Sequence, residues 1–152
     1  MPALSAAQRE LLERTRRAVL ATIAPDGGPR LVPIAFAVAG GGDDPLVLYS
    51  ALDEKPKSVS DPRALARVRD ILARPRVSVL VDEWSEDWSR LAWLRLDGQA
   101  SLLEPDNDRA AEHGMAVRLL RERYPQYATH RLEMRPVMRI EVDRAVGWVS
   151  RG

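Results

Sequence analysis

The segment Ala18-Val-Leu-Ala-Thr-Ile-Ala-Pro-Asp-Gly-Gly-Pro-Arg-Leu-Val-Pro-Ile-Ala-Phe-Ala-Val38 carries the strongest fold signal in this chain. Two runs rich in aliphatic and β-branched residues flank a turn that contains Asp-Gly, a pattern typical of a β-hairpin. Pro33 interrupts the second run, and because proline cannot donate to a sheet ladder, it predicts a bulge or an edge strand. The backbone groups around Pro33 are then free to bind another molecule.

Outward from this hairpin, the sequence predicts six strands and three helices. The strands are Ala18–Ala24, Arg30–Val38, Leu46–Ser50, Arg76–Asp82, a long strand Arg90–Leu103 that bends near Gly98, and Arg135–Val149. Short turns join the first three strands, so that part of the sheet is expected to be antiparallel. Six strands with few helices favour a closed or partly closed barrel of the mainly β (α+β) class. The length of 152 residues predicts a single domain, 1–152.

The helices are predicted from their start and stop signals. They run from the capping-box pair Ser5 and Gln8 to about Arg16, from Asp61-Pro62 to about Ala73, and from Asp106 or Asn107 to about Arg123. On the second helix, Leu65, Val68 and Leu72 are expected to face inward. The inward positions expected on the third helix are Ala111, Met115, Leu119 and Leu120.

Composition excludes several classes of function. The net charge of +1 argues against binding to nucleic acid and against a polybasic membrane anchor. The absence of cysteine excludes disulfides, thiolate zinc sites and cysteine nucleophiles. The N-terminus has no signal-peptide pattern, and the longest apolar stretch, 31–42, is too short to span a bilayer. We therefore expect a cytoplasmic protein that binds neither nucleic acid nor membrane.

The residues needed for acid–base, nucleophilic or metal chemistry are largely missing. His113 and His130 have no sequence neighbour that looks like a catalytic or metal-binding partner, and we expect both at the surface. Glu86 and Asp87 lie in a polar loop, where carboxylates are usually solvated. We assign no catalytic residue and no metal site. An enzyme with so few reactive side chains is one whose cofactor carries the reaction.

Two features point to a cofactor. Lys55 and Lys57, the only lysines, lie two positions apart in a chain that otherwise uses arginine 21 times. Lysine offers compact point charges, which suit a phosphate group. Trp84, Trp88 and Trp93 bring three of the four tryptophans within ten positions. Trp93 lies in a predicted strand and is expected in the core, whereas Trp84 and Trp88 lie in a polar loop and need a cofactor or a partner subunit to cover them.

These segments, in order, resemble the pyridoxamine 5′-phosphate oxidase-like superfamily of flavin-binding split barrels. The hairpin from Leu20 to Ile34 is similar to its opening hairpin, and Leu48-Tyr-Ser-Ala-Leu-Asp-Glu-Lys-Pro-Lys57 to its third strand and phosphate-binding turn. The runs 74–82 and 90–100 resemble the strand after its helix and its long central strand. The resemblance implies a six-stranded, mostly antiparallel split β-barrel with flanking helices.

Lys-Pro-Lys and the segment 84–93 are most similar to the branch of probable deazaflavin (coenzyme F-420) dependent enzymes. This resemblance implies a homodimer with two cofactor sites at the subunit interface and transfer of hydride from reduced F-420 to an unidentified organic acceptor. It implies that Ser50, Lys55 and Lys57 bind the cofactor phosphate, and that the backbone at Val32, Pro33 and Ile34 lies along the ring system. Trp84 and Trp88 would close the partner's site.

Three alternatives stay open. FMN ends in a single phosphate, whereas the F-420 tail continues through a phosphodiester into glutamates, and Arg63 and Arg67 could add charge for that longer tail. An FMN-dependent oxidase or reductase on the same fold is the first alternative. A non-enzymatic haem- or cofactor-binding protein is the second, and haem would require His113 or His130 as an axial ligand. Pyridoxamine phosphate oxidase itself is a weaker alternative, because no substrate-phosphate motif is evident.

Overall fold

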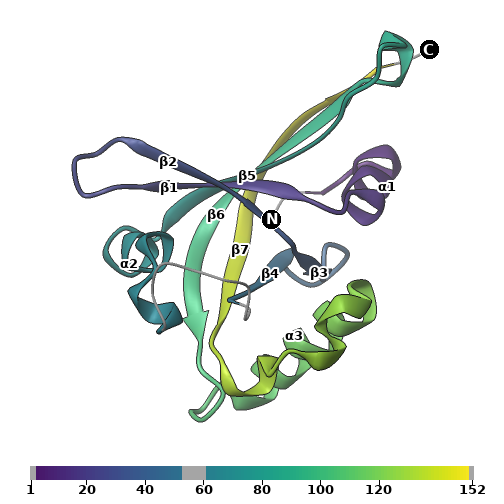
Figure 1. The fold of residues 1–152 in the computed structure, drawn as a ribbon. Helices are drawn as coiled ribbons and strands as arrows, with labels where there is room; N and C mark the ends of the chain where they lie inside the picture. Colours follow the sequence, from purple (N-terminus) through teal and green to yellow (C-terminus); the bar gives the residue numbers. More distant parts are fainter. Residues whose placement is uncertain (1–2, 53–60, 151–152) are drawn as a thin grey trace.

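The computed structural model describes residues 3–52 and 61–150 as one antiparallel sheet with helices packed around it (Figure 1). The helices are α1 (Ala6–Arg14), α2 (Ala66–Ala73) and α3 (Ala110–Arg123), with 3-10 turns at Pro62–Ala64, Trp88–Arg90, Pro125–Thr129 and Leu132–Met134. The strands are β1 (Ala18–Ile23), β2 (Pro29–Ile34), β3 (Ala37–Ala39), β4 (Val47–Ala51), β5 (Arg76–Glu83), β6 (Ala92–Leu103) and β7 (Val137–Val149).

The strand order is β2-β1-β5-β6-β7-β4-β3, and every pairing among the described strands is antiparallel. The sheet is open between β2 and β3, which are consecutive in the chain. This arrangement is an α+β split barrel and confirms the predicted fold class. The predicted hairpin is also confirmed, with Ile23 opposite Pro29 and Gly27 at a φ of 85° in the turn. The Ser5–Gln8 capping box begins α1 as expected.

The sheet has seven strands instead of six because the predicted strand Arg30–Val38 is two strands. The backbone N–H of Phe36 donates to the hydroxyl of Tyr124, 3.0 Å away, and the same hydroxyl lies 3.0 Å from the Phe36 carbonyl oxygen. These backbone groups therefore make no hydrogen bonds within the sheet. Before Phe36 the chain pairs with β1, and after it the chain pairs with β4. β2 is left at the edge of the sheet, which confirms the position predicted from Pro33.

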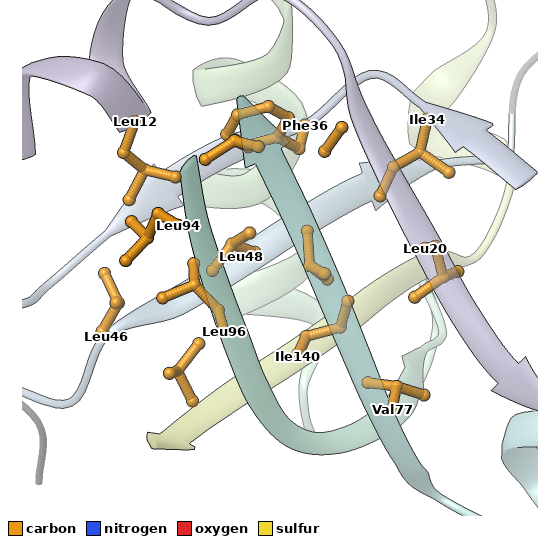
Figure 2. Close-up of a cluster of buried hydrophobic side chains, with 14 of the residues drawn as sticks. Leu12, Leu20, Ile34, Phe36, Leu46, Leu48, Val77, Leu94, Leu96 and Ile140 are labelled. Carbon is orange, nitrogen blue, oxygen red and sulfur yellow. The ribbon is translucent and has the colours of Figure 1, made fainter. Parts of the chain in front are cut away.

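The main core lies on the inner face of the sheet. Leucines from β1, β4 and β6 meet Phe36 and Ile140 there (Figure 2), and a second cluster lies between β3, β4 and α3. Leu65, Val68 and Leu120 are buried as predicted, and Met115 and Leu119 pack partly against the core, but the predictions for Leu72 and Ala111 were wrong. On α2, Ile71 is buried and Leu72 is exposed, and on α3 the buried residues are His113, Ala116, Val117 and Leu120. The second helix also begins later, since Asp61 and Pro62 form a 3-10 turn before Ala66.

β5, β6 and β7 extend beyond the rest of the sheet as a three-stranded arm (Figure 1). β6 follows β7 along its whole length, with a register shift between Asp97 and Gly98 that confirms the predicted bend. At Gly98 the neighbouring strand comes so close that a Cβ atom would lie 2.2 Å from the carbonyl oxygen of Glu141. Only glycine allows this approach.

We expect Gly98→Ala to lower the free energy of unfolding by about 2–3 kcal/mol, because the added methyl group meets backbone atoms that cannot rotate away. Gly114→Ala on α3 is the matched control. Nothing lies within 4 Å of its added Cβ, so it should be neutral or stabilising by up to about 1 kcal/mol. Urea unfolding of both variants measures the difference, and equal stability of the two would refute the bulge argument.

Candidate functional site

Val32, Pro33 and Ile34 lie together in β2, at the free edge of the sheet. Their side chains alternate, so that Ile34 is buried, Val32 packs partly against the core and Pro33 is exposed. One side of the β2 backbone pairs with β1, and no strand among the described residues pairs with the other. This edge can offer backbone donors and acceptors to a ligand.

Ser50 lies in β4 and is buried. Its hydroxyl donates a hydrogen bond of 2.9 Å to the carbonyl oxygen of Ala35, immediately after β2. The fold therefore brings Ser50 to the end of the Val32–Ile34 segment. While this bond persists, the hydroxyl can accept from a ligand but cannot donate to a phosphate. Lys55 and Lys57 lie outside the described residues.

Trp84 and Trp88 lie in the loop between β5 and β6, at the tip of the arm (Figure 1). Both side chains are 68% exposed, so the described part of the chain leaves them uncovered as predicted. The arm carries this loop away from β2, and one chain alone does not bring Trp84 and Trp88 onto Pro33. Hydrogen bonds from the Ser89 hydroxyl and backbone lower the pKa of Asp87, so this loop carboxylate holds no proton to donate near neutral pH.

Trp93 is not a core residue, and this prediction was wrong. Leu94 and Leu96 point inward, so strand alternation turns Trp93 to the opposite side, where it is 37% exposed. Its Cα partner on the neighbouring strand β7 is Trp148, which is 49% exposed. We call the surface on this side of β2, β1, β5, β6 and β7 the outer face. Its apolar side chains include Pro33, Val19, Leu80, Val146, Trp93 and Trp148, which the sheet register aligns.

A small polar group lies within the outer face and was not predicted. The Nε of Arg95 donates to Oδ1 of Asp97 at 3.1 Å, and the Ser78 hydroxyl donates to the same oxygen at 2.6 Å. Asp97 is 13% exposed in its side chain, and Arg95 is 41% exposed. The spacing Arg-x-Asp on one strand puts both on the same face, so alternation could have identified this pair.

A second unpredicted pair ties the hairpin to α2. Asp70 is buried, and its Oδ2 accepts from Nε of Arg30 and from the Thr22 hydroxyl, both at 2.7 Å. Burial opposes ionisation of Asp70, but these donors outweigh it and lower the pKa of the carboxyl. The guanidinium of Arg30 is partly exposed beyond this contact, so a positive charge stands beside the hairpin turn.

Two predicted candidates, Arg63 and His113, form hydrogen bonds with other parts of the chain. Arg63 forms a bidentate pair with Glu104 and also contacts Asp61, so much of its charge is already neutralised. Arg67 lies in the first turn of α2 and is partly buried. The expectation that His113 lies at the surface was wrong: it is 2% exposed on α3, and its Nε2 lies 2.6 Å from the Arg135 carbonyl oxygen. His130 is partly buried, with its ring edge-on to Tyr127.

A groove of about 430 Å³ between α1, β3 and α3 is lined by arginines, but it is a structural junction. Arg123 donates to the Leu12 and Thr15 carbonyls at the end of α1, and Arg9 donates to the Gly40 carbonyl. In residues 3–52 and 61–150, no three histidine, aspartate or glutamate side chains converge to hold a metal. No described helix has the length and apolar character to cross a bilayer.

Known proteins share this architecture. The family model described as pyridoxamine 5′-phosphate oxidase matches residues 4–149. A conserved hypothetical protein from Mycobacterium tuberculosis is 22% identical, with 97% of this chain and 86% of that chain covered and a TM-score of 0.69. An FAD-binding protein from Mesorhizobium loti is 24% identical, covering 95% and 94%, with a TM-score of 0.64.

A haem storage protein from Vibrio cholerae is 15% identical, covering 97% of this chain and 95% of that chain, with a TM-score of 0.64. No curated protein matches the chain. At these identities the solved structures show a common fold alone. That fold therefore occurs both in an FAD-binding protein and in a haem storage protein.

Proposed function

The chain belongs to the pyridoxamine 5′-phosphate oxidase family, and on this basis we propose that it is a homodimeric oxidoreductase that uses the deazaflavin F-420. The observation that carries the proposal is the exposed outer face beside the free edge of β2. An apolar, aromatic surface of this kind in a small domain is expected to be covered in the working protein. A tricyclic ring along β2 and a second copy of the chain would together cover it.

The residues of β2 fit a flat ring system. Pro33 has no backbone donor of its own, and the unpaired side of β2 presents the remaining polar groups at one edge. Burial of roughly 200 Å² of ring at about 25 cal/mol per Å² contributes about 5 kcal/mol before the cost of association. This is too little for tight binding, so charge pairing at the cofactor tail has to add to it.

When bound, reduced F-420 supplies a hydride, which carries two electrons, to an organic acceptor, and a proton from solvent completes the reduction. The chain contributes orientation and exclusion of water. The β2 backbone would hold the ring, Lys55 and Lys57 the tail, and the exposed Trp84 and Trp88 of the partner subunit would close the site. No side chain of this chain is assigned as proton donor.

Equilibrium titration of the purified apo-protein with F-420 and with FMN, followed by fluorescence, tests the proposal. Micromolar or tighter binding of F-420 with weak FMN binding is the expected result. The reverse preference would assign the protein to the FMN alternative, in which a yellow colour on purification is expected. Arg63 supports the longer F-420 tail less than its sequence position indicates, because Glu104 and Asp61 already pair with it.

If neither cofactor bound, haem would be titrated next, with the Soret band as the readout. His113 would have to leave the core and break its contact with the Arg135 carbonyl to become an axial ligand. His130 is therefore the histidine to replace. A Soret band that disappears in His130→Ala would support the haem alternative and exclude the deazaflavin proposal.

Lys57→Ala should weaken F-420 binding about 10- to 150-fold, because it removes a charge-assisted contact worth about 1.5–3 kcal/mol. Arg118→Ala, which removes an exposed charge from α3, is the control and should leave the affinity unchanged. The same titration measures both variants. An unchanged affinity in Lys57→Ala would remove Lys57 from the site.

A further inference from the structure

Arg95 lies among apolar side chains on the outer face, where Asp82 on β5 and Arg144 on β7 are its other charged neighbours besides Asp97. On the outer face its Cα partners are Leu80 on β5 and Val146 on β7, and Trp93 precedes it by two positions on β6. Leu80 and Trp93 are 39% and 37% exposed. A guanidinium in these surroundings remains hydrated only while the face is open to water.

The side chain of Arg95 is held in position by its Nε, while its terminal nitrogens are available for further hydrogen bonds. Asp97 accepts from Nε, and the Ser78 hydroxyl fixes the orientation of Asp97 through the same carboxylate oxygen. Within the described residues, Arg95 has no other recorded polar partner, so the terminal nitrogens Nη1 and Nη2 remain to donate. A guanidinium anchored at Nε presents a pre-oriented pair of donors, the geometry that suits a carboxylate or a similar oxyanion.

Covering the outer face would remove water from Nη1 and Nη2 of Arg95, which is costly unless an acceptor comes with the cover. Buried guanidinium nitrogens without acceptors are unfavourable, whereas nitrogens that meet an oxyanion in an apolar setting form charge-assisted hydrogen bonds. A neutral apolar ligand would therefore leave Nη1 and Nη2 without acceptors, although Asp97 still pairs with Nε, and a small hydrophilic anion would leave Leu80 and Trp93 exposed. A ligand that satisfies both parts is planar, apolar and negatively charged.

We propose that Arg95 binds the carboxylate or other oxyanion group of a planar, hydrophobic ligand that lies on the outer face beside Trp93 and Leu80, at the interface with the proposed second copy. The inference that this ligand is the hydride acceptor rests on the proposed function. Asp97 is a positioning residue, since it acts on the ligand only through Arg95. The acceptor class is then an organic anion with an extended conjugated or aromatic body.

The test uses two fluorescent probes of nearly the same shape, without any cofactor. One is the anion 8-anilinonaphthalene-1-sulfonate, and the other is the uncharged N-phenyl-1-naphthylamine, which lacks the sulfonate. Arg95→Met keeps an apolar side chain of similar length and removes the charge. We expect it to weaken binding of the anionic probe about tenfold or more, while binding of the neutral probe stays within twofold.

Two further variants separate charge from packing. Arg118→Met removes an exposed arginine from α3 and should change neither probe. Asp97→Asn retains the charge of Arg95 but weakens its anchor, so it should weaken the anionic probe by a smaller factor and leave the neutral probe unchanged. Circular dichroism confirms that each variant is folded, and Arg95→Gln replaces Arg95→Met if the latter is not.

If Arg95→Met weakened binding of the two probes equally, or left both affinities unchanged, the proposal would be overturned. Sedimentation equilibrium on the same samples tests whether a carboxylate of the second copy of the chain, and not the ligand, pairs with Arg95. If Arg95→Met dissociated the dimer and left the anionic probe unchanged, the partner of Arg95 would be a carboxylate of the second copy and the proposal would be wrong. Because no probe experiment includes F-420, a failure here is distinguishable from a failure of the deazaflavin proposal.

Discussion

Glu112→Ala should lower the free energy of unfolding by about 3–4 kcal/mol at pH 7, with a midpoint of thermal unfolding roughly 6–15 °C lower. The Glu112 carboxylate on α3 accepts from the Tyr49 hydroxyl at 2.6 Å, from Arg139 at 2.7 Å and from Arg109 at 2.9 Å. Tyr49 and Arg139 lie on β4 and β7, so one carboxylate joins the helix to two strands. Its removal leaves the buried Tyr49 hydroxyl and the largely buried Arg139 guanidinium without this acceptor.

The same contacts make this stabilisation depend on pH. Burial alone would raise the pKa of Glu112, but the hydrogen bonds from Tyr49, Arg139 and Arg109 outweigh it and hold the pKa at about 2. Because the folded pKa lies below the unfolded value, the contribution is fully present above about pH 5 and is lost as the pH falls towards 2. The stability gap between the wild type and Glu112→Ala should therefore shrink to less than half at pH 3.

Urea unfolding at pH 7 and pH 3 measures this gap. Glu122→Ala removes an exposed carboxylate from the same helix and should cost less than about 0.5 kcal/mol at either pH. Glu112→Gln keeps an acceptor without the charge and should fall between Glu112→Ala and the wild type. A gap that is the same at both pH values would mean that packing, and not the ionised carboxylate, accounts for the effect.

The fold was predictable where the signals are local. The Asp-Gly turn, the Ser5–Gln8 capping box and the proline in β2 each depend on residues a few positions apart, and all three are confirmed. The division of the second predicted strand was not predictable in this way. It depends on the hydroxyl of Tyr124, 88 positions from Phe36, which replaces the ladder partner of the Phe36 backbone.

The burial of His113 has a similar origin. Its acceptor, the carbonyl of Arg135, comes from a segment that folds back beside α3 only in the complete structure. On α3 the prediction for Ala111 was wrong. Alanine suits the interior by composition, but the helix phase set by Val117 and Leu120 exposes Ala111 and buries His113 instead.

The candidate site likewise combines features that the sequence predicts locally with features that only the folded structure brings together. β2 and the tryptophan loop could be identified from a proline and from aromatic composition. The partnership of Asp70 with Arg30 required the packing of α2 against the hairpin, 40 positions away. The outer face required the strand register, because Trp93 and Trp148 become neighbours only when β6 and β7 pair. The register thus converts scattered hydrophobic positions into one surface.

Replacing Trp93 and Trp148 together by glutamate should raise the dissociation constant of the proposed homodimer at least 100-fold. Trp93 and Trp148 are 37% and 49% exposed in one chain. A partner can therefore bury about 100 Å² of each, which at about 25 cal/mol per Å² corresponds to roughly 2–3 kcal/mol. In a dimer with a twofold axis each substitution occurs twice in the interface, and the new carboxylates would also lie close together across it. Both side chains are partly exposed in one chain, so the monomer should stay folded.

Sedimentation equilibrium over a range of concentrations measures this change, with Leu72→Glu as the control. Leu72 is an exposed apolar residue on α2, away from the outer face, and its replacement should leave association unchanged. F-420 affinity should fall together with dimerisation in the double variant, because the loop of Trp84 and Trp88 reaches a cofactor site only from the partner subunit under the proposed arrangement. A monomer that retained full F-420 affinity would separate the two parts of the proposal: the cofactor would bind along β2 of a single chain, and the tryptophans of the outer face would serve assembly alone.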